Sequence, residues 1–469
     1  MPTPHIIHCL WLNFGKLTDG VMDNKMTFFL RRIEALHKDW TIHFISKWDQ
    51  LLDDIKSEEW LTELVQNKYV NGAHKSDALR FFYLYTQGGV WVDISTFLVS
   101  PLHDLVEQNN DGFTCYYIPG DLCATWLLKQ TSEIFDNDIT AEEYARLIKP
   151  VQRQFIHIKD NLDIIPENYF IISSKKNEVC AHVLNSLRDF WSLNLEHIES
   201  AKDNCYRLNL YILDMINQIF EFNTDKYPYS DLFTSDVQRQ ILASFFDCGY
   251  LFNYLQLYIS IKEFKNSQNG TLITEPMSVE RTNAMKENLK LEALSAVMCN
   301  KEDCNIRKIE TKNPEKSIYL LSGQYNRFTK WSDKLNERIS WKNTLAGNII
   351  YNPENTAENV LQKLQNIGIT QLKYGSWTRD SDSLVKLMEL YEKKIDMVPQ
   401  NPREVTRTDS NRSRQGQITN SLQNNRSRSS PSPKSRSRPS LKSRSSPSPK
   451  SRSSSSPKSR SSSSPKSRS

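Results

Sequence analysis

Three ionic residues lie close together in the segment KSDALRFFYLYTQGGVWVDIS, and their spacing suggests a binding site for a charged ligand. Asp77 and Arg80 are three residues apart, so they share one face of a helix. Asp93 follows a short apolar run, which places a second carboxylate at the end of a strand. Such a cluster suits a nucleotide diphosphate, which needs acceptors for ribose hydroxyls, a cation for phosphate charge and an anchor for a divalent metal ion.

The elements around these residues predict how they meet. Ser76 is a good helix N-cap, and the spacing that follows predicts a helix over Ser76–Gln87. The pair Gly88-Gly89 ends that helix, because one of the glycines can take a positive φ at C′. The strand Val90–Ile94 then carries Asp93 to the carboxyl edge of a sheet, where ligands bind in open α/β folds.

The same spacing also fits a surface ion pair of Asp77 and Arg80 with a solvated Asp93 and no ligand. The longer sequence pattern around these residues favours a ligand-binding site over a surface ion pair. SDxxRxxxLxxxGGxWxD, over Ser76–Asp93, resembles the signature of glycosyltransferases containing the DxD motif, specifically the branch named for capsular polysaccharide synthesis proteins. The same arrangement occurs in the clostridial glucosylating toxins. The resemblance implies a GT-A-type fold and makes Asp93 and Arg80 the candidate catalytic residues, with Asp77 as a further donor-binding residue.

Two further segments fit this resemblance. HIIHCLWLNFG resembles the first strand of the family, whose Trp commonly stacks on the nucleotide base; the matching residue is Trp11. Base stacking on an aromatic side chain contributes roughly 1–3 kcal/mol. TQLKYGSWTRDSD resembles a carboxy-terminal segment that closes over the donor diphosphate, and it gives Ser376 and Trp377 as donor-binding candidates. Core filling by Trp11 and a strand-exit turn at Ser376 are the alternative interpretations.

One departure from the family pattern concerns the metal. A full DxD motif has a second Asp where this chain has Ser95. The resemblance implies that Asp93 and Ser95 hold Mn²⁺ or Mg²⁺ together with the diphosphate and waters, although a hydroxyl is a weaker oxygen ligand than a carboxylate. Alternatively, lysines such as Lys75 supply the positive charge.

The predicted function is transfer of a hexose-type sugar from a nucleotide-diphosphate sugar, with a UDP-sugar as the expected donor, to a hydroxyl of a glycan, protein or lipid acceptor. Relatives retain the anomeric configuration. Two alternatives remain: a pseudo-enzyme that binds a nucleotide sugar without turnover, and an RNA-associated adaptor with an arginine–serine tail. Against the adaptor, the chain shows no RNA-recognition signature of interleaved aromatic and basic residues.

Alternating short apolar runs and amphipathic segments predict an α/β fold with a mostly parallel, Rossmann-type (GT-A-like) sheet. Long helical patterns in the middle predict a helical lobe over about residues 178–300. The predicted helices are Val21–His37, Trp60–Asn67, Ser76–Gln87, Glu178–Trp191, Asn204–Phe222, Asp236–Phe246, Val279–Met298, Glu354–Gln365 and Asp380–Lys394. The predicted strands are Ile6–Leu12, Thr41–Ser46, Val90–Ile94, Phe113–Ile118, Tyr169–Ser173, Ile318–Ser322 and Ile369–Tyr374.

Charge divides the chain of 469 residues unevenly. The net charge is +5, but residues 403–469 hold 17 basic against two acidic residues, a net +15 that leaves −10 for the remainder. We therefore predict a glycosyltransferase domain over residues 1–400 and a disordered Arg/Ser/Pro-rich tail over 401–469, since the tail has too few apolar residues to form a core. Its Ser-Pro and Arg-Ser repeats predict contact with a kinase or weak binding of polyanions.

Cysteine usage and hydropathy predict a cytoplasmic protein. The eight cysteines are scattered without a CxxC pair, which argues against a disulfide framework or zinc site. The amino terminus is a poor signal peptide. We predict no membrane span, because the best apolar stretch, Tyr250–Ile261, is short and is interrupted by Asn253 and Gln256.

Overall fold

The structure is a computed structural model. It describes residues 2–22, 24–109, 112–119, 164–220, 250–275, 306–313, 316–322, 355–366 and 371–373, with three single residues between 142 and 152. The chain divides into two compact units, Met1–Gln400 and Asn401–Ser469, and all the described residues belong to the first. The predicted helices Asp236–Phe246, Val279–Met298 and Asp380–Lys394 and the predicted disordered tail lie outside the described residues.

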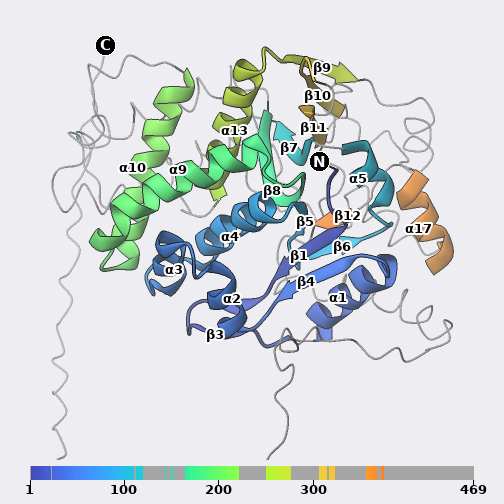
Figure 1. Ribbon diagram of the computed structural model, residues 1–469, viewed down its shortest axis with the longest axis horizontal. Helices are drawn as coiled ribbons and strands as arrows, with labels where there is room; N and C mark the ends of the chain where they lie inside the picture. The colour runs from blue at the N-terminus through green and yellow to red at the C-terminus, as the bar shows by residue number, and fades with distance from the viewer. Residues whose placement is uncertain are drawn as a thin grey trace, which may run out of the picture. The chain divides into compact units, whose positions relative to one another are not determined.

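Helices and strands alternate along the first unit (Figure 1). The strands are β1 Ile6–Leu10, β2 Leu12–Asn13, β3 Thr18–Asp19, β4 Thr41–Ile45, β5 Gly89–Val92, β6 Thr96–Leu98, β7 Phe113–Pro119, β8 Ile164–Ser173, β9 Thr271–Glu275, β10 Ile306–Glu310, β11 Ile318–Ser322 and β12 Gln371–Lys373. The helices are α1 Asn24–Leu36, α2 Trp48–Ile55, α3 Glu59–Gln66, α4 Gly72–Thr86, α5 His103–Asn109, α9 Glu178–Asn194, α10 Ala201–Phe220, α13 Tyr250–Ser267 and α17 Ala357–Asn366.

Eight of the described strands form one sheet in the order β4-β1-β5-β8-β7-β11-β10-β9. β1 is parallel to β4 and β5, and β7 is parallel to β11. β8 is antiparallel to both of its neighbours, and so is β10. Six strands therefore run in one direction and two in the other, which confirms the predicted α/β class with a mostly parallel sheet.

Helices cover both faces of this sheet (Figure 1). On one face, side chains of α2, α3, α4, α9, α10 and α13 pack into a large apolar core with Trp91 and Ile171. On the other face, α1 and α5 contribute Met26, Ile33 and Val106 to a second core. Helices α9, α10 and α13 lie in the stretch predicted as a helical lobe.

The predicted start of the central helix was wrong. α4 begins at Gly72, four residues before Ser76, and its N-cap is Asn71, whose side chain accepts a hydrogen bond from the Ala73 backbone N–H. Three of the described helices were missed: α2, α5, and α13 over the apolar stretch that begins at Tyr250. Among the described residues, no helix is both long enough and apolar enough to cross a lipid bilayer.

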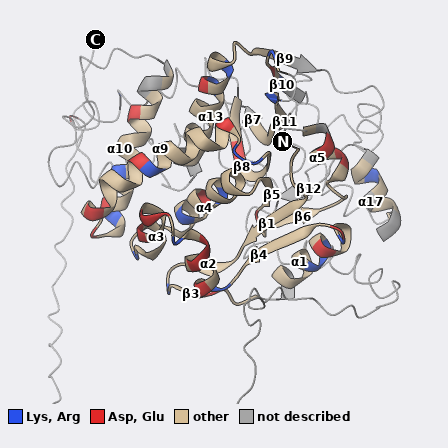
Figure 2. Cartoon of the chain, viewed as in Figure 1, with Lys and Arg blue, Asp and Glu red and all other residues tan. Residues whose placement is uncertain are grey.

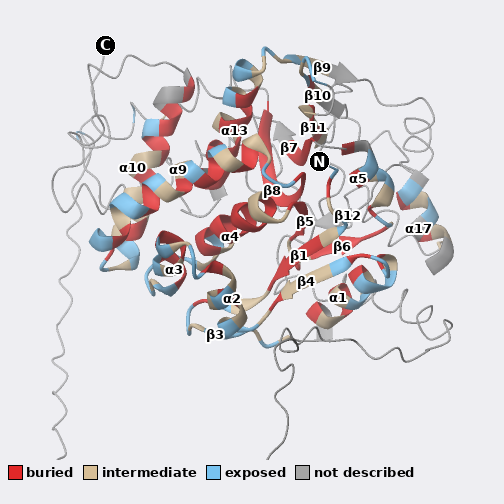
Figure 3. Cartoon of the chain, viewed as in Figure 1, coloured by how far each residue is buried: buried red, intermediate tan, exposed pale blue. Residues whose placement is uncertain are grey.

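Gly88 and Gly89 connect α4 to β5, and both take a positive φ, of 73° and 99°. This turn reverses the chain, so α4 runs back along the sheet and its N-terminal end lies toward the carboxyl ends of β1 and β5. Figure 3 shows that α4 and β5 are buried over most of their length. A helix with so little exposed surface holds its side chains in fixed positions, which suits a binding site.

Candidate active site

Arg80 joins the two predicted carboxylates. Its Nη1 donates to Asp77 Oδ1 at 2.5 Å and its Nη2 donates to Asp93 Oδ1 at 2.7 Å. The guanidinium is almost fully buried, whereas the Asp93 side chain is 26% exposed. The structure thus brings Asp77, Arg80 and Asp93 into one ionic cluster at the carboxyl edge of β5, with Asp93 as its most accessible member.

Trp91 supports this arrangement from β5. Its indole Nε1–H donates to Asp93 Oδ1 at 2.9 Å, and the Arg80 guanidinium lies 5.2 Å from its ring centre. Backbone hydrogen bonds fix Asp93 further: its N–H donates to the Tyr169 carbonyl of β8, and its carbonyl accepts from the Thr96 N–H. A carboxylate held in this way needs little reorganisation to bind a ligand.

Two amide side chains hold the other end of the cluster. Asn168 on β8 donates from Nδ2 to Asp77 Oδ1 at 3.0 Å, and Asn253 on α13 donates from Nδ2 to Asp77 Oδ2. Asp77 therefore accepts hydrogen bonds from side chains of α4, β8 and α13, and only 7% of the residue is exposed. Such donors stabilise a buried carboxylate in its charged form.

Asn168 and Asn253 were not among the predicted site residues. A signal for Asn253 was present in the sequence, because polar residues interrupt an otherwise apolar stretch at Asn253 and Gln256. Both residues are buried in α13, where a polar side chain needs a partner. Asn168 gave no comparable signal, since it directly precedes the predicted strand Tyr169–Ser173, where a polar residue is ordinary.

The predicted metal ligands Asp93 and Ser95 lie two residues apart in the chain. Ser95 is half-buried in the turn that follows Asp93. Among the described residues, no group of three His, Cys, Asp or Glu side chains could enclose a metal ion. The residues present fit a different mode, in which one accessible carboxylate, Asp93, anchors an ion whose other ligands come from phosphate oxygens, a hydroxyl and water, as is common for Mg²⁺.

Trp11 lies just after β1, at the same edge of the sheet. Its backbone N–H donates to the Ile45 carbonyl, and its indole Nε1–H donates to the Val21 carbonyl at 2.9 Å. The side chain is half-buried and packs against the core on the α1 face. Base stacking by Trp11 stays a prediction. Ser376 and Trp377 lie outside the described residues.

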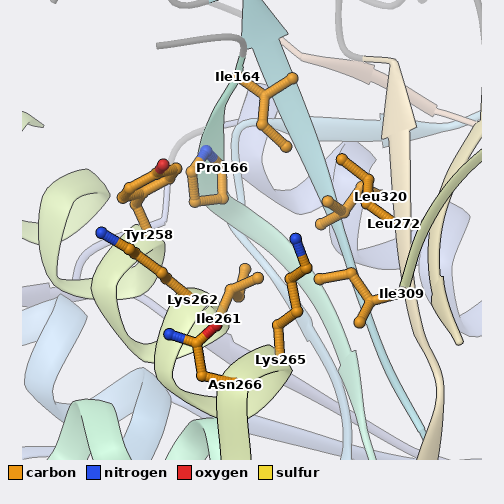
Figure 4. Close-up of a pocket in the computed structure, with 10 residues that line it drawn as sticks. All are labelled: Ile164, Pro166, Tyr258, Ile261, Lys262, Lys265, Asn266, Leu272, Ile309 and Leu320. Carbon is orange, nitrogen blue, oxygen red and sulfur yellow. The ribbon is translucent and has the colours of Figure 1, made fainter. Parts of the chain in front are cut away.

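A pocket of about 280 Å³ lies apart from the ionic cluster, between α13 and the strands β8 to β11 (Figure 4). Apolar side chains such as Ile164, Ile309 and Leu320 line it, together with Lys262 and Lys265. None of the three ionic residues is among its lining residues. Figure 4 shows that the pocket lies over the C-terminal half of α13, whereas Asn253 belongs to its first turn.

Comparison with known proteins gives a match at the ionic cluster. Residues 23–111 match the family model described as "Glycosyltransferase sugar-binding region containing DXD motif". No curated protein matches the chain. Among solved structures, the chain named "PaToxG Glycosyltransferase" is similar at 12% identity, over 54% of this chain and 87% of that chain, with a TM-score of 0.24. That TM-score is too low to inform the fold. The family-model match contains Asp77, Arg80, Asp93 and Ser95, and it supports a role in glycosyl transfer.

Proposed function

We propose that this chain is a glycosyltransferase that moves a sugar, a hexose type, from a UDP-sugar to a hydroxyl acceptor with retention of the anomeric configuration. The observation that carries this proposal is the hydrogen-bonded cluster Asp77–Arg80–Asp93, which lies at the ligand-binding edge of the sheet. All three residues fall inside the segment matched by the sugar-binding family model.

In the proposed reaction, the bond between the anomeric carbon and the β-phosphate oxygen breaks, and UDP leaves with the bonding electron pair. The acceptor hydroxyl oxygen bonds to the same carbon, and its proton passes to the departing diphosphate. Negative charge grows on the leaving diphosphate, so fixed positive groups near it lower the barrier. Arg80 is the fixed cation of the cluster, and its two carboxylate partners hold its position.

Asp77 is assigned a positioning role. The sequence suggests that it binds ribose or sugar hydroxyls, and that contact stays a prediction. Its carboxylate already accepts from Arg80, Asn168 and Asn253, which favours a role in orienting Arg80. Asp93 is the more accessible carboxylate and is assigned to the donor.

Asp93 and Ser95 would hold Mn²⁺ or Mg²⁺ with oxygens of the diphosphate. A bound ion of this kind supplies positive charge to the leaving group. Trp11 would lie under the base, and Ser376 and Trp377 would contact the diphosphate. The acceptor is a hydroxyl of a glycan, protein or lipid, and the expected location is the cytoplasm.

Hydrolysis of UDP-glucose and related donors, followed by mass spectrometry with and without Mn²⁺, tests the proposal. Wild type is expected to release free sugar from at least one donor. Asp93→Ala is expected to release sugar about 100-fold more slowly or worse, which is the typical effect of removing one electrostatic group. Asp53→Ala, at an exposed ion pair on α2, is the control and should keep full activity. Activity untouched by Asp93→Ala would refute the assignment.

A second candidate is a protein that binds a nucleotide sugar without turnover. Ser95 favours it, because it leaves Asp93 as the one carboxylate of the motif. This candidate predicts calorimetric binding of UDP with no product from any donor, whereas the enzyme predicts both.

A further inference from the structure

Lys75 is a buried cation that the cluster does not use. Its residue is 0% exposed, and within the described part of the chain its Nζ has no hydrogen-bond partner. Its neighbour is the ring of Phe14, whose centre lies 5.5 Å from Nζ. No carboxylate pairs with Lys75 among the residues that the structure describes.

An ammonium in this situation is costly, because it has lost water and gained only a weak contact with an aromatic ring. Burial lowers the pKa of Lys75 to about 8, so the group still carries its proton at neutral pH. Buried polar groups in folded proteins nearly always have partners, and an unpartnered one calls for a specific explanation. An anionic ligand would supply the missing partner.

The position of Lys75 indicates which anion. Lys75 belongs to the first turns of α4, and Lys side chains of a helix lean toward its N-terminus. Phe14 lies over that end of the helix, since a Cβ added to Gly72 would be 3.1 Å from Phe14 Cδ2. The positive end of the helix dipole and a lysine ammonium together form an environment that favours phosphate.

Arg80 lies five residues further along α4, about 7.5 Å along the axis at about 1.5 Å per residue. Phe14 lies in the β2–β3 hairpin that follows β1, and it packs into the core on the α4 face of the sheet. Lys75 therefore lies at the carboxyl edge of adjacent strands β1 and β5, where a bound dinucleotide or nucleotide phosphate is expected in such sheets.

We propose that Lys75 is a phosphate-binding residue of the donor site, whose ammonium contacts the diphosphate of the nucleotide sugar when Phe14 turns aside. This inference rests on the proposed function and deepens it. Phe14 covers the ammonium in the structure, so the ligand reaches Lys75 only after that side chain or its hairpin moves. Ser95 stands in place of a second Asp and is a weaker ligand for a metal ion. Lys75 would supply additional positive charge to the diphosphate.

Isothermal titration calorimetry of the full chain tests this inference with three probes: inorganic pyrophosphate, UDP and uridine. For Lys75→Met we expect binding of pyrophosphate and UDP to weaken at least about 10-fold, the loss expected for one charge-assisted contact. Uridine lacks phosphate, so its affinity should not change. The matched control is Lys68→Met, which removes an exposed lysine over the Tyr69 ring and should bind all three probes like wild type.

Circular dichroism and thermal unfolding accompany the titrations. Lys75→Met should be at least as stable as wild type because it removes an unpartnered charge. If it fails to fold, Lys75→Gln replaces it. Three results would overturn the inference. A folded Lys75 variant could bind pyrophosphate like wild type, or its affinities for UDP and uridine could fall equally. The third result is a wild-type protein that binds neither pyrophosphate nor UDP. Lys75-dependent pyrophosphate binding without sugar release from any donor supports the inference and contradicts the proposed function.

Discussion

Asp77 accepts hydrogen bonds from side chains that lie far apart in the sequence, on α4, β8 and α13. Each donor orients the carboxylate, and the carboxylate in turn orients Arg80 toward Asp93. A buried ion pair contributes little to stability once desolvation is counted, but removing one partner leaves the other charge uncompensated. At the scale of single residues, the cluster is therefore sensitive to every one of its donors.

Asn253→Ala tests this sensitivity. It leaves one oxygen of a buried carboxylate without that donor, so we expect the free energy of unfolding to fall by about 2 kcal/mol. We also expect slower sugar release at saturating donor. Urea unfolding and initial rates measure both effects. Asn266→Ala, at an exposed position of the same helix, is the matched control. Wild-type stability and rate in Asn253→Ala would show that the amide does not support Asp77.

Lys75 makes stability depend on pH. Burial lowers its pKa from 10.5 to about 8 in the folded protein, so the unfolded chain binds more protons between these values. Stability therefore rises as pH increases through this window. Without ligand, Lys75→Met should exceed wild type in free energy of unfolding by on the order of 3 kcal/mol at neutral pH. Urea unfolding of both proteins should show this gap shrinking toward pH 10.5; a gap that does not change with pH would contradict the prediction.

At the scale of elements, the turn between α4 and β5 sets the geometry of the cluster. Gly88 has φ 73°, and an added Cβ would lie 2.6 Å from the Lys175 backbone nitrogen. The Gly88 carbonyl accepts from His8 Nε2 at 2.8 Å. Burial lowers the pKa of His8 to about 4, so its ring is neutral at physiological pH and its Nε2–H serves this bond. The turn is thus fixed from β1 as well as by its own glycines.

Gly88→Ala should destabilise the protein by about 2 kcal/mol or more, because it combines a left-handed backbone with a steric clash against another backbone segment. Thermal unfolding measures the effect, and donor hydrolysis should fall with it. Gly15→Ala serves as the control, since its added Cβ would meet nothing closer than 3.6 Å. Equal melting temperatures for the two variants would show that the turn tolerates a side chain.

The sequence predicted the parts of the site that local patterns encode. The double glycine, the helix before it and the strand after it follow from positive-φ preference and hydrophobic periodicity, so the meeting of Asp77, Arg80 and Asp93 was foreseeable. Ser76 misled the prediction of the helix start, because Asn71 caps the same helix earlier. The contacts of Asn168 and Asn253 depend on tertiary packing of β8 and α13, which no local pattern encodes.

At the scale of the whole molecule, charge separates the two units. Residues 403–469 carry +15 and the rest of the chain −10. Figure 2 shows acidic residues, coloured red, along α2 and α3 of the first unit. The ionic cluster lies in the first unit, whereas the excess of basic residues lies in the second. We therefore expect the first unit to act on the sugar donor and the second to bind polyanions.

A chain that ends at Gln400 should therefore hydrolyse the donor at a rate within about twofold of the full chain. Its binding to RNA should be lost, because the contacts of a basic tail with phosphates are electrostatic and fall steeply with salt. Donor hydrolysis and filter binding at two salt concentrations measure the two activities separately. Loss of hydrolysis in the shortened chain would assign the tail to the reaction.

Asp77, Arg80 and Asp93 are expected to act as one unit on one donor. A double-mutant cycle on kcat/KM for donor hydrolysis, with Asp77→Asn, Asp93→Asn and both together, tests it most directly, since residues in one hydrogen-bonded network couple. We predict that each single variant loses most of the activity and that the double variant loses little more than the worse single variant. Losses that add independently, or a single variant with wild-type activity, would contradict the claim.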